Sequence, residues 1–459
     1  MKQDGSYPKF HSYRGSFLRL LLDQTTFRTA ASTSLVLVLI FALQNWFCIQ
    51  LRKYMGNLLR PLAMLGVILA TTGTARAQLD NGAFTSPMPG IAARPLVPLG
   101  TSLVNTPDPV LSDSLAGQLR LSLNAFTFFK DNEYFNKIAD GYTLFGTQLN
   151  PQLVYYPTRG LRLEAGVFLW KDFGNPVLQQ VRPTFRATWT KGHNQFVFGN
   201  LRANLHHEYI EPLFDFERVM LKPLEEGLQY RHVSNRVFLD VWVDWLRQQY
   251  RYSNYQEEIA GGLSSRFVLT RPDCRVQVSL PFQFTAQHHG GQIDTLNKPL
   301  QTLFNEAAGV EVRLPIGIHG RALRFNGYVL GLQDHSFTYL LPYQYGRALY
   351  LNTTLESRYV DVMLSYWQGS RFFAPLGGTY YQSLSSSVTD PHFTDPNRRL
   401  LLVRLLRDFR ISDAAAVTVR IEPVYDFQIQ LLDFSFGVYL NFRQDWLLGN
   451  VGRRGRLGQ

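Results

Sequence analysis

At 459 residues the chain is long enough for two or three globular domains, yet no stretch of helical periodicity separates its strand-like segments, which indicates one large all-β unit. The formal charge of +11 lies at the ends, because residues 1–77 hold nine Lys/Arg against two Asp/Glu and residues 451–459 add three arginines. Since about +1 remains for residues 78–450, a nucleic-acid partner loses its support.

Residues 55–77 have the order of a secretory signal peptide. Arg60 precedes the apolar run from Leu62 to Ala70, and Ala75 and Ala77 form an A-x-A site before Gln78. The pattern predicts export and cleavage after Ala77, so that the mature chain begins at Gln78.

The segments on either side of this signal carry two further expectations. Residues 1–54 contain a second apolar run and are interpreted as a mis-called N-terminal extension, with a membrane anchor as the alternative. Residues 78–114 are rich in proline and are expected to form an extended periplasmic lead-in. After cleavage Cys274 is the only cysteine, so no intramolecular disulfide is expected.

From residue 115 to residue 442 the chain divides into about sixteen segments in which apolar and polar residues alternate. In Leu432–Phe442, for example, every second side chain is apolar and the intervening ones are mostly small or polar. This period predicts an antiparallel, up-and-down β-barrel that spans a membrane. The clearer segments are 119–129, 143–156, 161–170, 181–190, 236–245, 258–269, 275–287, 308–315 and 415–425.

The connections alternate between short and long, as in barrels with both termini in the periplasm. The short ones are 157–160, 191–194, 234–235 and 271–273, and the long ones are 206–226, 288–302, 334–347 and 369–398. The long connections are expected outside the cell. For residues 375–399 two placements stay open, an inward constriction or an outer cap.

These features resemble Gram-negative outer-membrane β-barrel proteins of porin-like size, over Gln78 to about Asn450. The segment Val438–Phe442 looks like the C-terminal strand that barrel-assembly machinery reads, although a basic tail, 443–459, follows it. The resemblance implies an outer-membrane location, contact with lipid and assembly machinery, and an aqueous lumen for small polar solutes. It points to no narrower family.

Charged residues of both signs fall on the expected lumen face. A channel lined in this way filters solutes by charge and size, whereas the alternative is a salt-bridged wall without selectivity. The candidate selectivity residues are Arg120, Arg162, Arg182, Arg186, Arg266, Arg275, Arg313, Arg324, Glu164, Asp240, Asp244 and Glu311.

One local motif supports a second hypothesis, a lipid hydrolase. His232-Val-Ser234-Asn235 resembles the His-x-Ser-Asn pattern of outer-membrane phospholipases and lipid A deacylases, in which the His activates the Ser on the barrel's outer surface. The expected topology places Ser234 at a periplasmic turn, away from the outer leaflet. The residues therefore favour a channel over an enzyme.

Other chemistry has little support in the sequence. His206-His207 and His288-His289 do not have the spacing of a closed metal site, because neighbouring side chains on an extended segment point apart. No metal or other cofactor is expected. A structural barrel subunit of an envelope complex remains a third hypothesis, and the sequence fixes neither the solute nor the oligomeric state.

Overall fold

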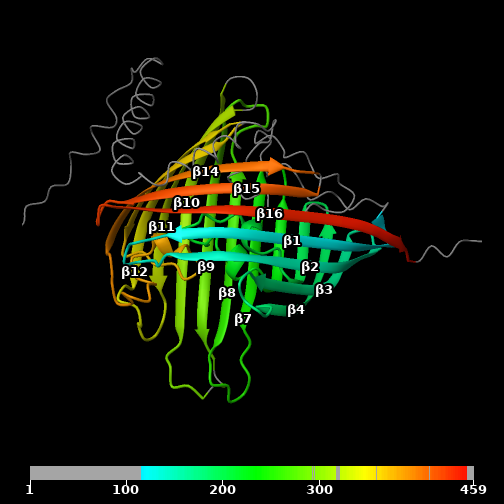
Figure 1. Cartoon of the computed structure of the whole chain (residues 1–459), viewed down its shortest axis with the longest axis horizontal. Helices are drawn as coiled ribbons and strands as arrows, with labels where there is room; N and C mark the ends of the chain where they lie inside the picture. The colour runs from blue at the N-terminus through cyan, green and yellow to red at the C-terminus, as the bar shows by residue number, and fades with distance from the viewer. Residues whose placement is uncertain are drawn as a thin grey trace, which may run out of the picture. The chain divides into compact units, whose positions relative to one another are not determined.

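The computed structural model describes residues 115–451, apart from Gln292, Asp294, 317–320, Arg358 and Asp413. The predicted extension, signal peptide and lead-in, and tail residues 452–459, lie outside the described residues. Within the described part, sixteen antiparallel strands pair in chain order, and β1 pairs with β16 to close a barrel (Figure 1). The predicted all-β barrel of about sixteen strands is confirmed.

The strands are joined by turns and loops that contain three short helices. The strands are β1 (Gln118–Glu133), β2 (Tyr142–Thr158), β3 (Leu161–Asp172), β4 (Gln180–Lys191), β5 (Asn194–Asn200), β6 (Glu226–Val233), β7 (Val237–Arg247), β8 (Glu257–Val268), β9 (Gln277–Gly290), β10 (Gln301–Ile316), β11 (Arg321–Asp334), β12 (Tyr345–Glu356), β13 (Asp361–Ser370), β14 (Asn397–Arg410), β15 (Ala415–Asp426) and β16 (Leu431–Asn450). The helices are η4 (Asn204–His207), α3 (Arg218–Leu221) and η5 (Thr379–Tyr381).

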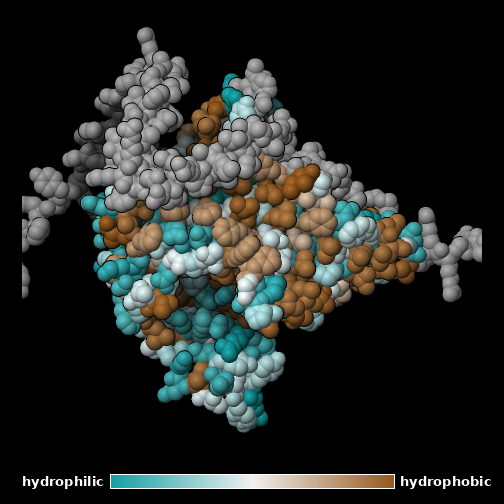
Figure 2. All heavy atoms as spheres, viewed as in Figure 1, coloured by the Kyte–Doolittle hydropathy of each residue, from teal (hydrophilic) through white to brown (hydrophobic). Residues whose placement is uncertain are grey.

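The two-residue period of each strand separates a lumen face from an outer face. In β7, Asp240 and Trp242 are buried, whereas Val241 and Trp245 are 37% and 44% exposed. The inward face thus carries the acids Asp240 and Asp244 together with buried aromatics, and the outward face is apolar, as in a barrel that meets lipid. Figure 2 shows hydrophobic side chains over the barrel wall and hydrophilic ones on the loops that extend beyond β7–β9.

The connections sort by length into two ends of the barrel. The end that holds Gln118 and Asn450 has the short connections and is called the turn end, and the opposite end is called the loop end. Gly160 and Gly192 have φ of +90° and +60° in two of the turns, a backbone conformation that favours glycine. The alternation of short and long connections predicted from the sequence is thereby present in the structure.

The last strand is longer than predicted. The sequence places the barrel's end at Phe442, but β16 runs to Asn450 and pairs with β1 along that length, including Trp446 with Leu121. Residues 443–450 therefore belong to the barrel wall, where Trp446 continues the outward face at 42% exposure. The basic tail is reduced to the residues that follow.

No helix in the described part of the chain is long and apolar enough to cross a membrane.

Candidate functional site

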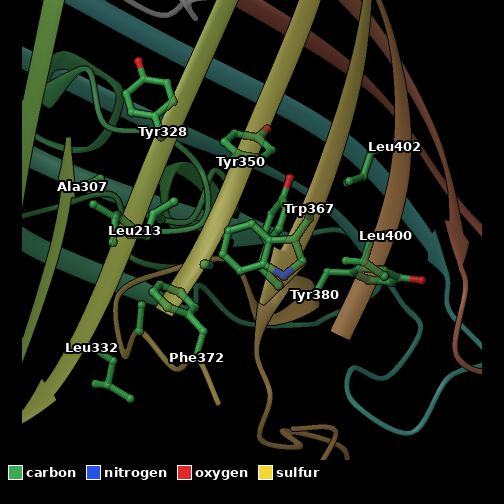
Figure 3. Close-up of a cluster of buried hydrophobic side chains, with 14 of the residues drawn as sticks. Leu213, Ala307, Tyr328, Leu332, Tyr350, Trp367, Phe372, Tyr380, Leu400 and Leu402 are labelled. Atoms are coloured by element: carbon green, nitrogen blue, oxygen red, sulfur yellow. The ribbon is translucent and has the colours of Figure 1, made fainter. Parts of the chain in front are cut away.

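Two loop-end connections, residues 201–225 and 371–396, are together called the lumen partition, because 201–225 and the first part of the second, 371–383, are buried against the lumen face of the barrel. Leu213 of the first is fully buried, and it belongs to one apolar cluster with lumen-facing Tyr328, Tyr350 and Trp367. Figure 3 shows these side chains reaching inward from neighbouring strands toward Leu213 and Phe372. The connections 206–226 and 369–398 lie at the loop end, as their length predicted, but 201–225 and 371–383 fold into the lumen, because their apolar side chains are buried against its wall. Which side of the membrane the loop end faces stays a prediction.

The first partition segment contacts strands on several sides of the barrel. Glu208 binds Arg266 of β8 at 2.9 Å, Tyr209 donates to the carbonyl of Phe284 on β9 at 2.9 Å, and Phe216 packs on Tyr439 of β16. The two partition segments also join each other: the amide of Asp215 donates to the carbonyl of Leu376 at 2.8 Å. The partition is therefore anchored across the lumen and does not hang from one wall.

A cluster of ion pairs holds the partition to β1, β14 and β15. Glu211 pairs with Arg404 and, at 3.1 Å, with Arg420, and both arginines also pair with Glu422 of the wall. Glu217 lies 2.9 Å from Lys130 of β1. Burial raises the pKa of Glu217. The charge of Lys130 and the hydrogen bonds that Glu217 accepts together outweigh burial and hold the pKa of Glu217 below its usual range.

His207 of η4 is clamped between two carboxylates. Its Nε2 lies 2.7 Å from Glu225 and its Nδ1 lies 3.0 Å from Asp240 of β7, and all three side chains are fully buried. Burial lowers the pKa of His207, but the two carboxylates outweigh it and raise the pKa to about 9. Since a charged imidazole donates through both nitrogens, His207 has no lone pair for general-base chemistry, and its role is to anchor the partition.

The predicted selectivity residues lie on the lumen face, with one exception. Arg275 precedes β9 in an exposed turn, so its assignment to the lumen is wrong, because the strand begins two residues later than the alternation suggested. Arg162, Arg182, Arg186, Arg266, Arg313 and Arg324 pair with acids of the wall or of loop segments, for example Arg162 with Glu164 and Arg313 with Glu356, both within 3 Å. Arg120 donates to the side-chain oxygen of Gln118. Their role in selectivity stays a prediction.

The structure does not arrange His232 and Ser234 as a catalytic pair. The hydroxyl of Ser234 accepts from the amide of Val237 at 3.1 Å inside the β6–β7 turn, and His232 Nδ1 lies 2.9 Å from the amide oxygen of Asn194. Among the described contacts, no hydrogen bond joins the imidazole to the hydroxyl, and Asn235 is exposed. The motif sits at the turn end, as predicted, and serves the local turn.

A different imidazole and hydroxyl meet on the barrel's outer wall at the loop end. His288 Nδ1 lies 2.8 Å from Thr302 Oγ1, and the two residues are register partners on β9 and β10. Thr285 on β9 and Leu303 on β10 are buried on the lumen face. Because side chains alternate between the two faces of a strand, His288, three positions after Thr285, and Thr302, next to Leu303, point outward. A hydroxyl within hydrogen-bond reach of an imidazole is the geometry of a nucleophile and its base.

A second polar chain lies beside this pair on the same outer wall. The amide of Gln333 donates to Glu306 at 3.0 Å, and its oxygen lies 3.2 Å from Nε2 of His335. The His335 ring also packs against Phe304 in a tilted arrangement with centroids 4.6 Å apart, and the His335 backbone amide donates to the carbonyl of Thr302. Ionisable groups on a face that otherwise meets lipid are costly and mark functional positions.

Sequence reasoning singled out His288 only as a metal-ligand candidate and missed its partner Thr302 for a physical reason. Thr302 meets His288 across a long loop, and register across a long loop does not follow from alternation alone. The inward fold of 201–225 was open to detection, because Leu213, Phe214 and Phe216 form an apolar run that an exposed loop would not need.

A closed antiparallel barrel with a polar, partly filled lumen and an apolar outer wall defines the class of integral outer-membrane β-barrel proteins. The chain belongs to the lipid A 3'-O-deacylase-type family, whose family model matches residues 110–451. That match covers the whole described barrel and the partition.

Several solved outer-membrane proteins are similar to the chain in structure. OpdL of Pseudomonas aeruginosa is 14% identical, with 72% of this chain and 99% of that chain covered and a TM-score of 0.45. OprD of Pseudomonas aeruginosa is 9% identical over 74% and 99% of the two chains, with a TM-score of 0.45. A loop L8 deletion mutant of OmpT of Vibrio cholerae is 12% identical over 72% and 100%, with a TM-score of 0.43.

No curated protein matches the chain.

Proposed function

We propose that the protein is an outer-membrane hydrolase that removes an ester-linked acyl chain from a lipid of the lipid A class in the outer leaflet. The observation that carries this proposal is the family match over residues 110–451, which spans the barrel and names lipid A 3'-O-deacylation. Outer-membrane barrels have short turns in the periplasm and longer loops outside. The loop end, with His288 and Thr302, then meets the outer leaflet, and the turn end, with Ser234, meets the periplasm.

The His288–Thr302 pair supplies the chemistry for acyl transfer. His288 Nδ1 accepts the proton of Thr302 Oγ1 as that oxygen attacks the ester carbonyl, and the protonated imidazole then gives the proton to the departing lipid hydroxyl. Water, activated by the same imidazole, hydrolyses the acyl-threonine and releases a fatty acid. The outward position of both side chains lets a lipid ester reach them without entering the lumen.

The test is acyl release from lipid A by purified full-length protein in detergent micelles, followed by mass spectrometry. Thr302→Val and His288→Gln are expected to lower the rate by at least a hundredfold, whereas Thr302→Ser keeps a hydroxyl and retains measurable activity. Ser234→Ala is the matched control, because its hydroxyl serves a turn at the other end, and its rate is expected to stay within twofold of wild type. Loss of activity in Ser234→Ala with retention in Thr302→Val contradicts the site.

A channel for small polar solutes is the second candidate function, and the charged lumen favours it. Arg162, Arg186 and Glu164 lie on the lumen face within one connected set of ion pairs. The partition narrows the passage, so conduction would follow the charged wall beside it. Stepwise ohmic conductance in planar bilayers supports this candidate, and silence in both assays favours a structural subunit of an envelope complex.

A further inference from the structure

Three exposed arginines lie together at the loop end of β12, β13 and β14 and are called the arginine patch. Arg347 of β12 and Arg399 of β14 are on the outer face, because the next residues along their strands, Ala348 and Leu400, are buried on the lumen side. Arg371 directly follows β13 and is also exposed. The patch therefore belongs to the outer wall and not to the lumen.

The strand register brings these arginines to one place. Arg347 is the register partner of Ser370 on β13, and Arg399 is the register partner of Gln368 two positions earlier on the same strand. The backbones of β12 and β14 are about 10 Å apart across β13, and Arg371 continues from Ser370 between them. Three long cationic side chains thus surround two short polar ones.

The contacts of the arginine patch are all with uncharged groups. The Arg371 guanidinium lies 6.0 Å from the ring centroid of Tyr343, and Nη2 of Arg399 lies 3.5 Å from the side-chain oxygen of Gln428. Within the described part of the chain, none of the three arginines forms an ion pair. Their positive charge is therefore left for a partner outside the chain.

Two acids lie beside the patch and are engaged with other groups. Glu306 of β10 lies across Gly331 of β11 from the patch and accepts a hydrogen bond from Gln333 at 3.0 Å. Asp395 lies 3.8 Å from the buried guanidinium of Arg398. Neither acid neutralises the patch through an ion pair.

The side chains next to the patch indicate its level in the membrane. One row closer to the turn end, outward Tyr366 of β13 and Tyr425 of β15 are both register partners of Leu401 on β14. The following row is apolar, with Leu364 paired to Val403. Because aromatic side chains collect where the hydrocarbon meets the headgroups, the arginines beyond them stand at headgroup level.

We propose that the arginine patch binds the phosphate group of a lipid headgroup in the outer leaflet. Its charge is complementary to phosphate, and the planar, forked guanidinium groups match phosphate oxygens in pairs. The Gln368 amide and the Ser370 hydroxyl, which lie between the arginines, offer further donors. The proposal rests on the barrel orientation used for the proposed function, but it does not require acyl release.

The experiment is native mass spectrometry of the detergent-solubilised full-length protein, titrated with lipid A and separately with the same lipid after removal of its phosphates. Wild type is expected to bind the phosphorylated lipid about thirtyfold more tightly. The double variant Arg347→Gln/Arg399→Gln is expected to lose about thirtyfold in affinity for it, because each arginine near an anionic headgroup contributes to binding.

Arg321→Gln is the matched control. Arg321 is an exposed, outward arginine on β11, but it lies at the turn end, so its loss is expected to leave the affinity within about twofold of wild type. Heat-modifiable mobility on gels shows whether each variant keeps its closed barrel, so that a loss of binding is not mistaken for a loss of fold.

Equal affinity of wild type for the two lipids, or no binding of either, overturns the proposal. An unchanged affinity in the double variant overturns it as well, and so does a loss in Arg321→Gln as large as that in the double variant. The mass of the bound lipid shows whether its acyl chains are intact, so failure of binding and failure of hydrolysis are separate results.

Discussion

The imidazole of His207 and the carboxylate of Glu225 meet at 2.7 Å with neither side chain exposed. Glu225 immediately precedes β6, and His207 lies at the far end of the same inserted segment, so this contact closes the segment into a loop tied to the wall. Asp240 of β7 completes the clamp from the wall side. The partition's position in the lumen thus depends on a buried charge balance as well as on apolar packing.

Partition stability is expected to fall between pH 6.5 and pH 9. Because the pKa of His207 is raised from 6.5 to about 9 in the folded protein, its stabilising contribution is complete below pH 6.5 and is lost as pH rises through 9. Deprotonation of His207 is expected to lower the stability of the folded partition by about 3 kcal/mol. Amide hydrogen exchange of residues 201–225, corrected for the intrinsic pH dependence of exchange, measures this loss of stability.

His207→Gln provides the control for this pH dependence. The variant lacks the titrating ring, so its partition is expected to be less stable at pH 6 and nearly independent of pH from 6 to 9. If the variant keeps the same pH dependence as wild type, another group is responsible and His207 is not the anchor.

Leu213→Ala is expected to loosen the partition without opening the barrel. Leu213 is fully buried in the cluster of Figure 3, and truncating such a leucine costs about 2–5 kcal/mol through lost burial and the cavity left behind. Hydrogen exchange should quicken in both 201–225 and 371–396, while the strands keep their protection. Leu351→Ala, at an outward site on β12 that is 42% exposed, should leave both segments unchanged.

The barrel was predictable from the sequence because lipid and lumen impose a period of two on every strand. In β7, the alternation alone assigns Asp240 and Asp244 to the lumen and Val241 and Val243 to the outside, as the structure has them. The end of β16 was missed because Gln444 places a polar side chain at an outward position, so that Arg443, Gln444 and Asp445 form a polar run. The sequence pattern therefore assigns this part of the strand to the basic C-terminal tail.

The candidate sites were far less predictable, because they form between segments distant in sequence. Glu211 meets Arg404 and Arg420 some two hundred positions later, and no local pattern encodes that contact. His232 and Ser234 were proposed as a pair because they lie two positions apart in the sequence. Thr302 and His288 lie fourteen positions apart, so sequence spacing alone does not pair them. Local spacing shows which side chains share a face, and only the fold shows which ones meet.

Protein recovered from the native outer membrane is expected to begin at Gln78. The order of Arg60, an apolar run and Ala75-Arg76-Ala77 is that of a cleaved export signal. N-terminal sequencing or mass spectrometry of the mature protein measures the cleavage point. Recovery of chains that start at Met1 would show that the signal is not processed, and Ala77→Leu should block cleavage if the site is right.

The loop end is expected to face the cell exterior, and a tag inserted next to Phe337 tests this. Phe337 lies in the β11–β12 loop and is 93% exposed, so an epitope there leaves the wall and the partition intact. It should be labelled on intact cells by an impermeant antibody. The control is the same epitope inserted at Gly192 in the β4–β5 turn, where a Cβ would have no neighbouring atom within 4 Å. This epitope should be labelled only after the outer membrane is permeabilised. Labelling of the Gly192 epitope but not of the Phe337 epitope on intact cells would show that the barrel has the opposite orientation. His288 and Thr302 would then lie at the periplasmic leaflet, where they could not act on a lipid of the outer surface.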